Sequence, residues 1–332
     1  MTDALFLTSE AVDDLATPAD YVAAVRDGYR EVGEGAPAEP RTLLPSGDPP
    51  GMLTTYVAML PEVGAMGGYT YAAGFAERDA WFLTPLFDAE TGEPLAVIDG
   101  ASMNPFKTGA AGAVAVDALA RPDASTVAVI GSGPQARGQL RTTATVRDLT
   151  GVRVFSPTPA NRESFADEFA ERLDADVTAV SSANAALAGA DVVITATTAS
   201  EPVIADADVE PGTHVTAMGQ YAADKHELPP ELVARATYVP DLTARATRDA
   251  GSFIAAREAG LVSDDDLEVE LGDVVAGSHP GRTSDDEVTV FDSGGTGIET
   301  VAAAHMLYER AREAGRGTPL SIAPASEALT GL

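Results

Sequence analysis

A glycine-rich turn at residues 131–136 carries the strongest chemical signal in the chain. The β-branched run Thr126–Ile130 leads into Gly-Ser-Gly-Pro-Gln-Ala, and a helical pattern follows. Glycine at the first position permits the tight turn, glycine at the third lets backbone approach a pyrophosphate, and the small sixth residue lets helix pack on strand. Free amides at the helix start favour the phosphates. We expect cofactor contacts from Gly131, Ser132, Gly133, Gln135 and Ala136. The alternative is a glycine-rich turn that binds nothing.

The end of the second strand bears on the choice of cofactor. An acidic residue there would bind the ribose hydroxyls of NAD. Here Phe155 is followed by Ser156, Thr158 and Arg162, with no carboxylate among residues 156–162. Hydroxyl groups and an arginine suit a 2′-phosphate, so this tip favours NADP(H) over NAD(H). The alternative is that Arg162 opens the next helix in solvent. Further cofactor contacts are expected at Thr197, Gly219, Ser293 and Gly295.

Lys107 and Arg41 are candidate ligands for a substrate carboxylate. Lys107 is one of only two lysines, and it precedes an alanine-rich stretch, 108–119, predicted to be a helix with Thr108 near its cap. A carboxylate at that place would meet both an ammonium group and helix-end N–H donors. Arg41 stands at an expected strand start. The alternatives are a lysine that extends to solvent and an arginine in a surface ion pair.

Tyr221 is a candidate proton donor, because a phenol supplies an O–H group. It could equally cover the nicotinamide as an aromatic lid. The four histidines show no spacing typical of metal ligands, so no metal site is expected. The absence of cysteine excludes disulfides, cysteine–zinc sites and thiol catalysis.

These residues need a scaffold, and from residue 126 onward the pattern alternates between short β-branched runs and helical stretches. We predict strands at 126–130, 152–155, 177–180, 192–196, 215–218, 236–239 and 288–291. We predict helices at 135–147, 162–172, 183–188 and 297–315. Such a rhythm implies a parallel sheet with right-handed crossovers, which is an α/β fold.

The first hundred residues have a different texture. Thr17-Pro18 predicts a helix start, because a hydroxyl cap is followed by proline at the first position. Short runs separated by glycine, proline and aspartate then predict a meander or mixed sheet. Its strands are expected at 52–60, 69–73, 81–87 and 95–98, with a hairpin turn at 88–92.

The charge balance excludes two classes of partner. The chain has 51 acidic and 21 basic residues and a net charge of −30, which would repel nucleic acid and anionic lipid. No apolar run approaches the length of a membrane span and the start lacks a signal-peptide pattern, so we expect a soluble, cytoplasmic protein. Dispersed acidic charge fits adaptation to high salt, where the Debye length falls to about 3 Å at about 1 M.

Five stretches together resemble the ornithine cyclodeaminase/mu-crystallin family. They are the hairpin at 87–96, the helix start at 107–111, the turn at 130–136, the late strand at 212–219, and residues 281–282 with 290–295. The matches are collinear from about residue 41 to 310. The resemblance implies a Rossmann NAD(P)-binding domain, residues 119–300, inserted into an α+β substrate and dimerisation domain. The latter would comprise residues 1–118 and 301–332 and form homodimers through its sheets.

The resemblance also assigns substrate residues. The family's substrate arginine falls on Arg41, and a second arginine falls on Lys107, which keeps the charge but loses the bidentate fork. The family's strand lysine falls on Thr70, and the acidic residue of the cyclodeaminases falls on Tyr221. Asp224 could replace that acidic residue only if the loop bends differently. The changes at Thr70 and Tyr221 argue against ornithine cyclodeamination and leave cofactor binding unaffected.

Three functions remain open. Members of the family act on α-amino or α-imino acids, as cyclodeaminases, archaeal alanine dehydrogenases, and reductases of cyclic ketimines or iminosuccinate. The leading expectation is an NAD(P)-dependent oxidoreductase that interconverts a small 2-imino, 2-oxo or cyclic imino acid and its L-amino acid. The alternatives are ornithine cyclodeaminase with internally recycled NAD, and a non-catalytic NADP(H)-binding protein resembling the crystallin.

Overall fold

The computed structural model describes residues 2–75 and 79–330, and the chain divides into two compact units. Unit 1 comprises Met1–Lys107 and Thr296–Leu332, and unit 2 comprises Thr108–Gly295. The boundaries expected from sequence, after residues 118 and 300, fall inside the helices α3 (Asn104–Leu119) and α11 (Gly297–Glu313). No helix in the described part of the chain combines the length and apolarity needed to cross a bilayer.

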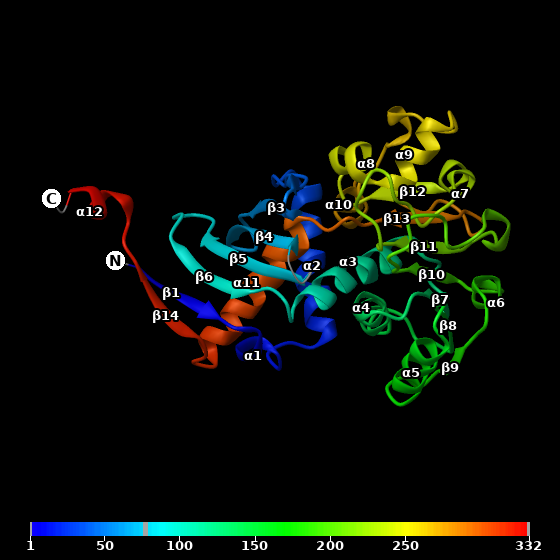
Figure 1. Cartoon of the computed structure of the whole chain (residues 1–332), viewed down its shortest axis with the longest axis horizontal. Coiled ribbons are helices and arrows are strands. Elements are labelled where there is room, and N and C mark those ends of the chain that lie inside the picture. The colour runs from blue at the N-terminus through cyan, green and yellow to red at the C-terminus, as the bar shows by residue number, and fades with distance from the viewer. Residues whose placement is uncertain (1, 76–78, 331–332) are drawn as a thin grey trace. The chain divides into compact units, whose positions relative to one another are not determined.

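Unit 2 contains a seven-stranded sheet in which every pair of neighbours is parallel (Figure 1). The order is β12-β13-β11-β10-β7-β8-β9. The strands are β7 (Thr126–Ile130), β8 (Gly151–Phe155), β9 (Asp176–Ala179), β10 (Val192–Thr195), β11 (His214–Ala217), β12 (Thr237–Pro240) and β13 (Thr289–Asp292). The predicted α/β fold with a Rossmann-type parallel sheet is therefore confirmed, and each predicted strand lies within one or two residues of the observed one.

Both faces of this sheet are covered. Val127 and Val129 belong to one apolar core, and Ala128 and Ile130 belong to another, because successive side chains of a strand point to opposite faces. The helices are α4 (Pro134–Thr143), α5 (Pro159–Ala170), α6 (Ala183–Leu187), α7 (Pro230–Arg235), α8 (Thr243–Asp249), α9 (Gly251–Glu258) and α10 (Leu271–Val275), with 3-10 turns at Asp206–Asp208 and Asp264–Asp266. Burial on both faces explains why the strand sequences are continuous apolar runs.

Unit 1 contains a mixed sheet of order β14-β1-β6-β5-β4-β3-β2. Its strands are β1 (Thr2–Leu7), β2 (Thr42–Gly47), β3 (Pro50–Leu60), β4 (Ala65–Phe75), β5 (Asp79–Asp88), β6 (Pro94–Asp99) and β14 (Thr318–Ile322). The β1–β6 pair is parallel and the other pairs are antiparallel. Strands β3 to β6 were predicted, whereas β1, β2 and β14 were not, because their sequences lack a clean alternation of apolar and polar residues.

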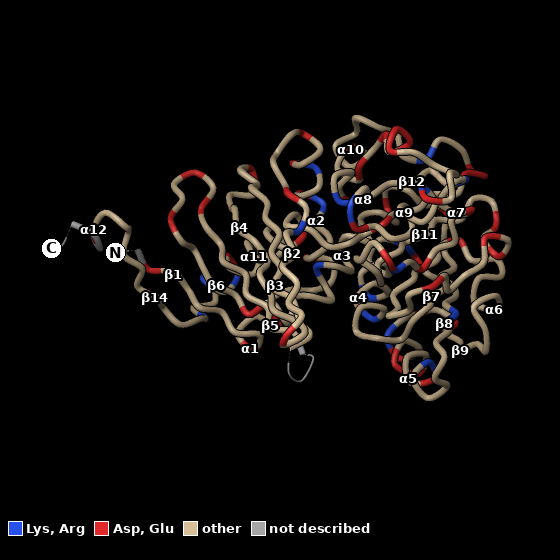
Figure 2. Tube along the Cα trace, turned by 45° about the horizontal axis from the view of Figure 1, so that its top comes forward, with Lys and Arg blue, Asp and Glu red and all other residues tan. Residues whose placement is uncertain are grey.

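Helices cover one face of the unit 1 sheet. The long helix α11 packs on this face, and α2 (Pro18–Gly33), which starts at the predicted Thr17 cap, packs against α11 and β3. The short helices of the unit are α1 (Ser9–Val12) and, after β14 in the chain, α12 (Ala325–Thr330). In β3, Tyr56 and Ala58 are buried on the helix side, whereas Val57 and Met59 are exposed on the other face. Acidic residues are scattered along the traces of both units, as Figure 2 shows.

Candidate functional site

The predicted dinucleotide turn forms at the carboxyl end of β7. Gly131 has φ +122°, and a Cβ atom there would lie 2.3 Å from the carbonyl oxygen of Ala196, so only glycine fits. Its N–H donates to the carbonyl of Phe155 at 2.8 Å. Gly133 caps the start of α4, and a Cβ atom there would meet nothing within 4 Å. The backbone at Gly133 therefore borders open space that a side chain would fill.

The start of α4 offers donors without a side-chain acceptor. Its N-cap makes no side-chain hydrogen bond, and the next residue, Pro134, has no N–H to satisfy. The Oε1 atom of Gln135 is buried and has no hydrogen-bond partner among the described residues. Ala136 is fully buried, as expected for the residue that lets α4 pack on the sheet. This turn fits a dinucleotide diphosphate, which would supply acceptors at the helix start.

The tip of β8 adjoins the same turn. The Ser132 hydroxyl donates to the Ser156 hydroxyl at 2.9 Å, which connects the two predicted segments. Arg162 donates from Nη1 to the Ser156 carbonyl at 2.9 Å, and its guanidinium lies 5.9 Å from the Phe155 ring centroid. Thr158 is the exposed N-cap of α5. Arg162 therefore folds back over the strand end instead of extending into solvent.

The remaining predicted cofactor residues follow the next strands of the sheet. Thr197 follows β10 and Gly219 follows β11, and a Cβ atom at Gly219 would lie 2.5 Å from the Thr197 nitrogen. Ser293 follows β13 and donates its N–H to the Ala217 carbonyl at 2.9 Å, and Gly295 has φ +81°. The structure thus gathers these residues at the carboxyl edge of the parallel sheet, where ligands bind in open α/β folds.

Two charged groups at this edge were missed by sequence reasoning. The first is Glu227, which is 1 % exposed and accepts four hydrogen bonds. Its partners are the Thr195 hydroxyl (2.9 Å), the Thr197 N–H (2.7 Å) and hydroxyl (2.6 Å), and the Gly219 N–H (2.7 Å). Burial raises the pKa of the Glu227 carboxyl, and the donated hydrogen bonds oppose that rise.

The second is Arg245, a buried guanidinium that pairs with the carboxylates of Asp241, Asp249 and Asp292. The Asp241 carboxylate also accepts the Gly294 N–H at 2.8 Å, so the cluster fixes the turn after β13. Neighbouring aspartates raise the pKa of Arg245 against the effect of its burial, which keeps the guanidinium charged. Glu227 and Arg245 belong to no motif that we recognised in the sequence, so neither residue was predicted to lie at the site.

In unit 1, Lys107 and Arg41 are buried beside the same aromatic ring. The Lys107 ammonium lies 4.7 Å from the Tyr69 ring centroid and 5.8 Å from that of Tyr56, and the Arg41 guanidinium lies 5.6 Å from the Tyr56 centroid. Lys107 is 1 % exposed, so it does not extend to solvent, and Arg41 is 5 % exposed, so it is not a surface residue. The aromatic faces stabilise both cations.

Glu299 is the counter-charge that sequence reasoning missed. Its Oε1 lies 3.5 Å from the Lys107 Nζ, and both side chains are buried. Glu299 also completes the capping box of α11, because it accepts the Thr296 N–H at 2.7 Å and the Thr296 hydroxyl. Burial lowers the pKa of the Lys107 ammonium, and the Glu299 carboxylate opposes this effect.

Two sequence-based expectations in unit 1 are corrected. The helix expected from residue 108 begins at Asn104, so Lys107 lies within its first turn and Thr108 is not its cap. The Asn104-Pro105 pair was the overlooked signal, because proline favours the first helical turn. Thr70 lies on the opposite face of the sheet from Tyr69 and the two cations, since neighbouring strand residues alternate.

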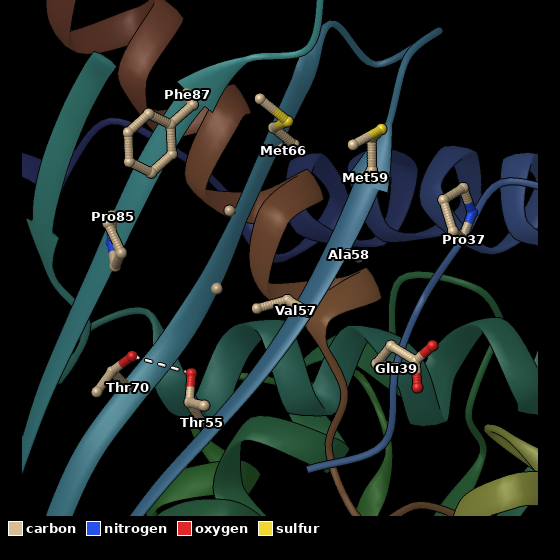
Figure 3. Close-up of a pocket in the computed structure, with 12 residues that line it drawn as sticks. Pro37, Glu39, Thr55, Val57, Ala58, Met59, Met66, Thr70, Pro85 and Phe87 are labelled. Carbon is tan, nitrogen blue, oxygen red and sulfur yellow. Dashed lines mark hydrogen bonds between the residues drawn. The ribbon is translucent and has the colours of Figure 1, made fainter. Parts of the chain in front are cut away.

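The Thr70 side chain belongs to a groove on the outer face of the unit 1 sheet. Its hydroxyl lies 3.0 Å from that of Thr55, as the dashed line in Figure 3 shows. The groove encloses about 380 Å³ and is lined mainly by apolar residues such as Val57, Met59 and Phe87. Neither Arg41 nor Lys107 lines it.

Tyr221 lies on the loop after β11 and is 40 % exposed.

His214 is buried and hydrogen-bonded to the hydroxyls of Thr289 (2.9 Å) and Thr216 (3.1 Å), and burial lowers its pKa to about 3. Within residues 2–75 and 79–330 no group of three or more His, Asp or Glu side chains is arranged to hold a metal ion.

Comparisons with known proteins identify the family. The sequence profile of the ornithine cyclodeaminase/mu-crystallin family matches residues 2–315. A Δ1-pyrroline-2-carboxylate reductase from Bacillus cereus is 36 % identical over 233 residues, 70 % of this chain and 71 % of that protein.

Two solved structures share the whole fold. The Thermococcus litoralis Δ1-pyrroline-2-carboxylate reductase, in complex with NADH and L-proline, is 30 % identical with a TM-score of 0.89, over 95 % of this chain and 100 % of that one. An archaeal alanine dehydrogenase dimer with bound NAD is 30 % identical with a TM-score of 0.90, over 97 % and 100 %. The chain belongs to the ornithine cyclodeaminase/mu-crystallin family.

Proposed function

We propose that this protein is an NAD(P)H-dependent reductase that converts a small 2-imino acid, open-chain or cyclic, into the L-amino acid, and catalyses the reverse oxidation. The observation that carries the proposal is the pair of buried cations, Arg41 and Lys107, beside aromatic rings in a chain that also has the glycine turn at 131–136. The names of the relatives, pyrroline-2-carboxylate reductase and alanine dehydrogenase, support this substrate class.

Each residue of the buried cluster around Lys107 has a defined role in this proposal. Arg41 and Lys107 bind the substrate carboxylate, and the Tyr56 and Tyr69 rings exclude water and strengthen that attraction. Glu299 holds the Lys107 ammonium in place at 3.5 Å. A lysine whose pKa is lowered by burial can also donate a proton to the substrate nitrogen, and Tyr221 is the second candidate for that transfer.

The cofactor proposal rests on unit 2. Bound nicotinamide would supply hydride to C2 of the C=N bond, while the nitrogen takes a proton. The amides at the start of α4 would hold the diphosphate, and Thr197, Gly219, Ser293 and Gly295 would border the nicotinamide half. We infer a preference for NADP(H), because Ser156, Thr158 and Arg162 offer donors to a 2′-phosphate. The solved neighbours are named with NADH or NAD, so support for this preference comes from the β8 tip of this chain alone.

The test is an absorbance assay of NAD(P)H oxidation in molar salt. The purified protein should turn over with Δ1-pyrroline-2-carboxylate, or with a 2-oxo acid plus ammonium. Proline released from ornithine without net change in cofactor absorbance would indicate a cyclodeaminase instead. Binding of NADPH without turnover of any of these substrates would indicate the crystallin-like alternative.

We further propose a homodimer in which the outer face of the unit 1 sheet is covered by a second copy. That face exposes Val57, Met59, Trp81 and Leu83, which are 40 % to 76 % exposed, and carries the apolar groove of about 380 Å³. The archaeal alanine dehydrogenase of the same fold is described as a dimer. Contiguous apolar surface of this kind is typical of an interface between subunits.

The working environment proposed for the protein is a cytoplasm rich in salt. The net charge of −30 on 332 residues produces strong self-repulsion at low ionic strength. Molar salt screens these charges over about 3 Å. Thermal unfolding measured across a series of potassium chloride concentrations should therefore show stability rising with salt.

A further inference from the structure

The buried Glu227 carboxylate connects two segments that leave neighbouring strands. Its Oε1 accepts both the N–H (2.7 Å) and the hydroxyl (2.6 Å) of Thr197, just after β10. Its Oε2 accepts the N–H of Gly219 (2.7 Å), just after β11, and the hydroxyl of Thr195 (2.9 Å). The Thr197 segment and the start of the loop that carries Tyr221 are thereby joined through one side chain.

Only a carboxylate can accept all four bonds. The Thr197 hydroxyl already accepts the Ala199 N–H at 3.2 Å, so its own proton is directed at Glu227. An amide in place of the carboxylate would present an NH₂ group to a backbone N–H, either that of Thr197 or that of Gly219. One of the two segments would then lose its acceptor. The site is also tight, because a Cβ atom on Gly219 would lie 2.4 Å from the Glu227 Oε1.

We propose that Glu227 is a positioning residue that sets the spacing of the Thr197 and Gly219 segments and so fixes the cradle for the nicotinamide half of the dinucleotide. The inference rests on the proposed function, because both segments are proposed cofactor contacts. Glu227 is buried behind them, so it acts through their backbone and not by touching the cofactor. Rigid, prepositioned backbone lowers the entropy lost on binding.

The chain offers a matched control at the opposite edge of the same sheet. The Asp191 carboxylate accepts the N–H groups of Ser125 and Thr126, both at 3.0 Å, and the Thr126 hydroxyl at 2.8 Å. It also pairs with Arg121. Asp191 therefore joins β7 and β10 at their amino ends as Glu227 joins β10 and β11 at their carboxyl ends, and its loss should cost comparable stability without affecting the cradle.

The experiment compares Glu227→Gln with Asp191→Asn by calorimetric titration of NADPH and NADH, at a temperature where all variants are folded. We expect Glu227→Gln to weaken cofactor binding by about 10-fold or more, as for the loss of a hydrogen bond to a charged group. Asp191→Asn should change the dissociation constant less than about 2-fold. It should lower Tm by about as much as Glu227→Gln does. Equal dissociation constants for the two variants would overturn the inference.

A milder pair of variants covers the case in which Glu227→Gln does not fold. Thr195→Val removes one donor to Glu227, and Thr126→Val removes one donor to Asp191, in both cases with little change of side-chain volume. Only Thr195→Val should weaken binding, by about 3-fold, because it removes one of the four hydrogen bonds that hold Glu227. An unchanged affinity in that variant refutes the role of Glu227, whereas absence of binding by the wild-type protein refutes the proposed function itself.

Discussion

The two sheets of this protein differ in how their faces are used. The parallel sheet of unit 2 is covered on both faces, and its proposed cofactor contacts lie at the carboxyl edge, where Glu227 and the Arg245 cluster fix the turns. The mixed sheet of unit 1 is covered on one face only. That covered face holds Arg41 and Lys107, and the other face remains apolar and exposed. A sheet with one free face can therefore combine a polar site with an apolar interface.

The largest effect is expected from a substitution of Lys107, which should separate the substrate chemistry of unit 1 from the cofactor binding of unit 2. Lys107→Met should lower kcat/KM for the imino acid at least about 100-fold, because the carboxylate loses a buried cation. The NADPH dissociation constant should stay within about 2-fold, since Lys107 belongs to unit 1. Lys225→Met, at the other lysine, which is exposed, is the control in both assays. Equal losses of cofactor affinity and activity would contradict the separation.

The next largest effect is expected on dimer dissociation, from a substitution on the free face of the unit 1 sheet. Leu83→Asp places a charge on the proposed dimer interface and should raise the dimer dissociation constant at least about 30-fold, a cost typical of an interface hot spot. Analytical ultracentrifugation measures this constant. Leu261→Asp is the matched control, because Leu261 is 47 % exposed and Leu83 50 % exposed. If both variants sediment as wild type does, the face is not the interface.

A smaller effect is expected at the edge of the unit 2 sheet. Arg162→Gln should weaken NADPH binding about 10-fold and leave NADH binding unchanged, because only NADPH carries the 2′-phosphate. Arg172→Gln, at a half-exposed arginine paired with Glu168, tests whether general loss of positive charge has the same effect. A wild-type protein that binds NADH more tightly than NADPH would refute the cofactor preference.

The last effect, which is the smallest when expressed per pH unit, concerns burial within the unit 2 sheet. The pKa of His214 is lowered to about 3, so between about pH 6.5 and pH 3 the unfolded chain binds a proton that the folded chain does not. Stability attributable to His214 is therefore lost as pH falls through this window, by about 1 kcal/mol per pH unit. His214→Gln should flatten the pH dependence of the free energy of unfolding by that slope, measured by denaturant titration. An unchanged slope would mean that the pKa of His214 is not lowered in the folded chain.

The same difference between the sheets explains what could be predicted from the sequence. Strands buried on both faces appear as continuous β-branched runs, so the parallel sheet and the turn at Gly131 were predicted and the family was confirmed. Thr70 was assigned to the substrate site, although Tyr69 is the neighbour that faces the cations, because a motif match does not show which face of a sheet a residue occupies. Glu227 and Glu299 were missed because their burial depends on partners 30 or more residues away in Thr197 and Lys107.

Glu299 has a consequence for how the sequence of this chain can change. One carboxylate both begins helix α11 and neutralises Lys107, so two unrelated requirements act on a single position. A substitution that satisfied the helix alone would leave an ammonium group buried without a counterion, and one that satisfied the ammonium alone would fray the helix. Positions 107 and 299 should therefore vary together or not at all, even though 192 residues separate them.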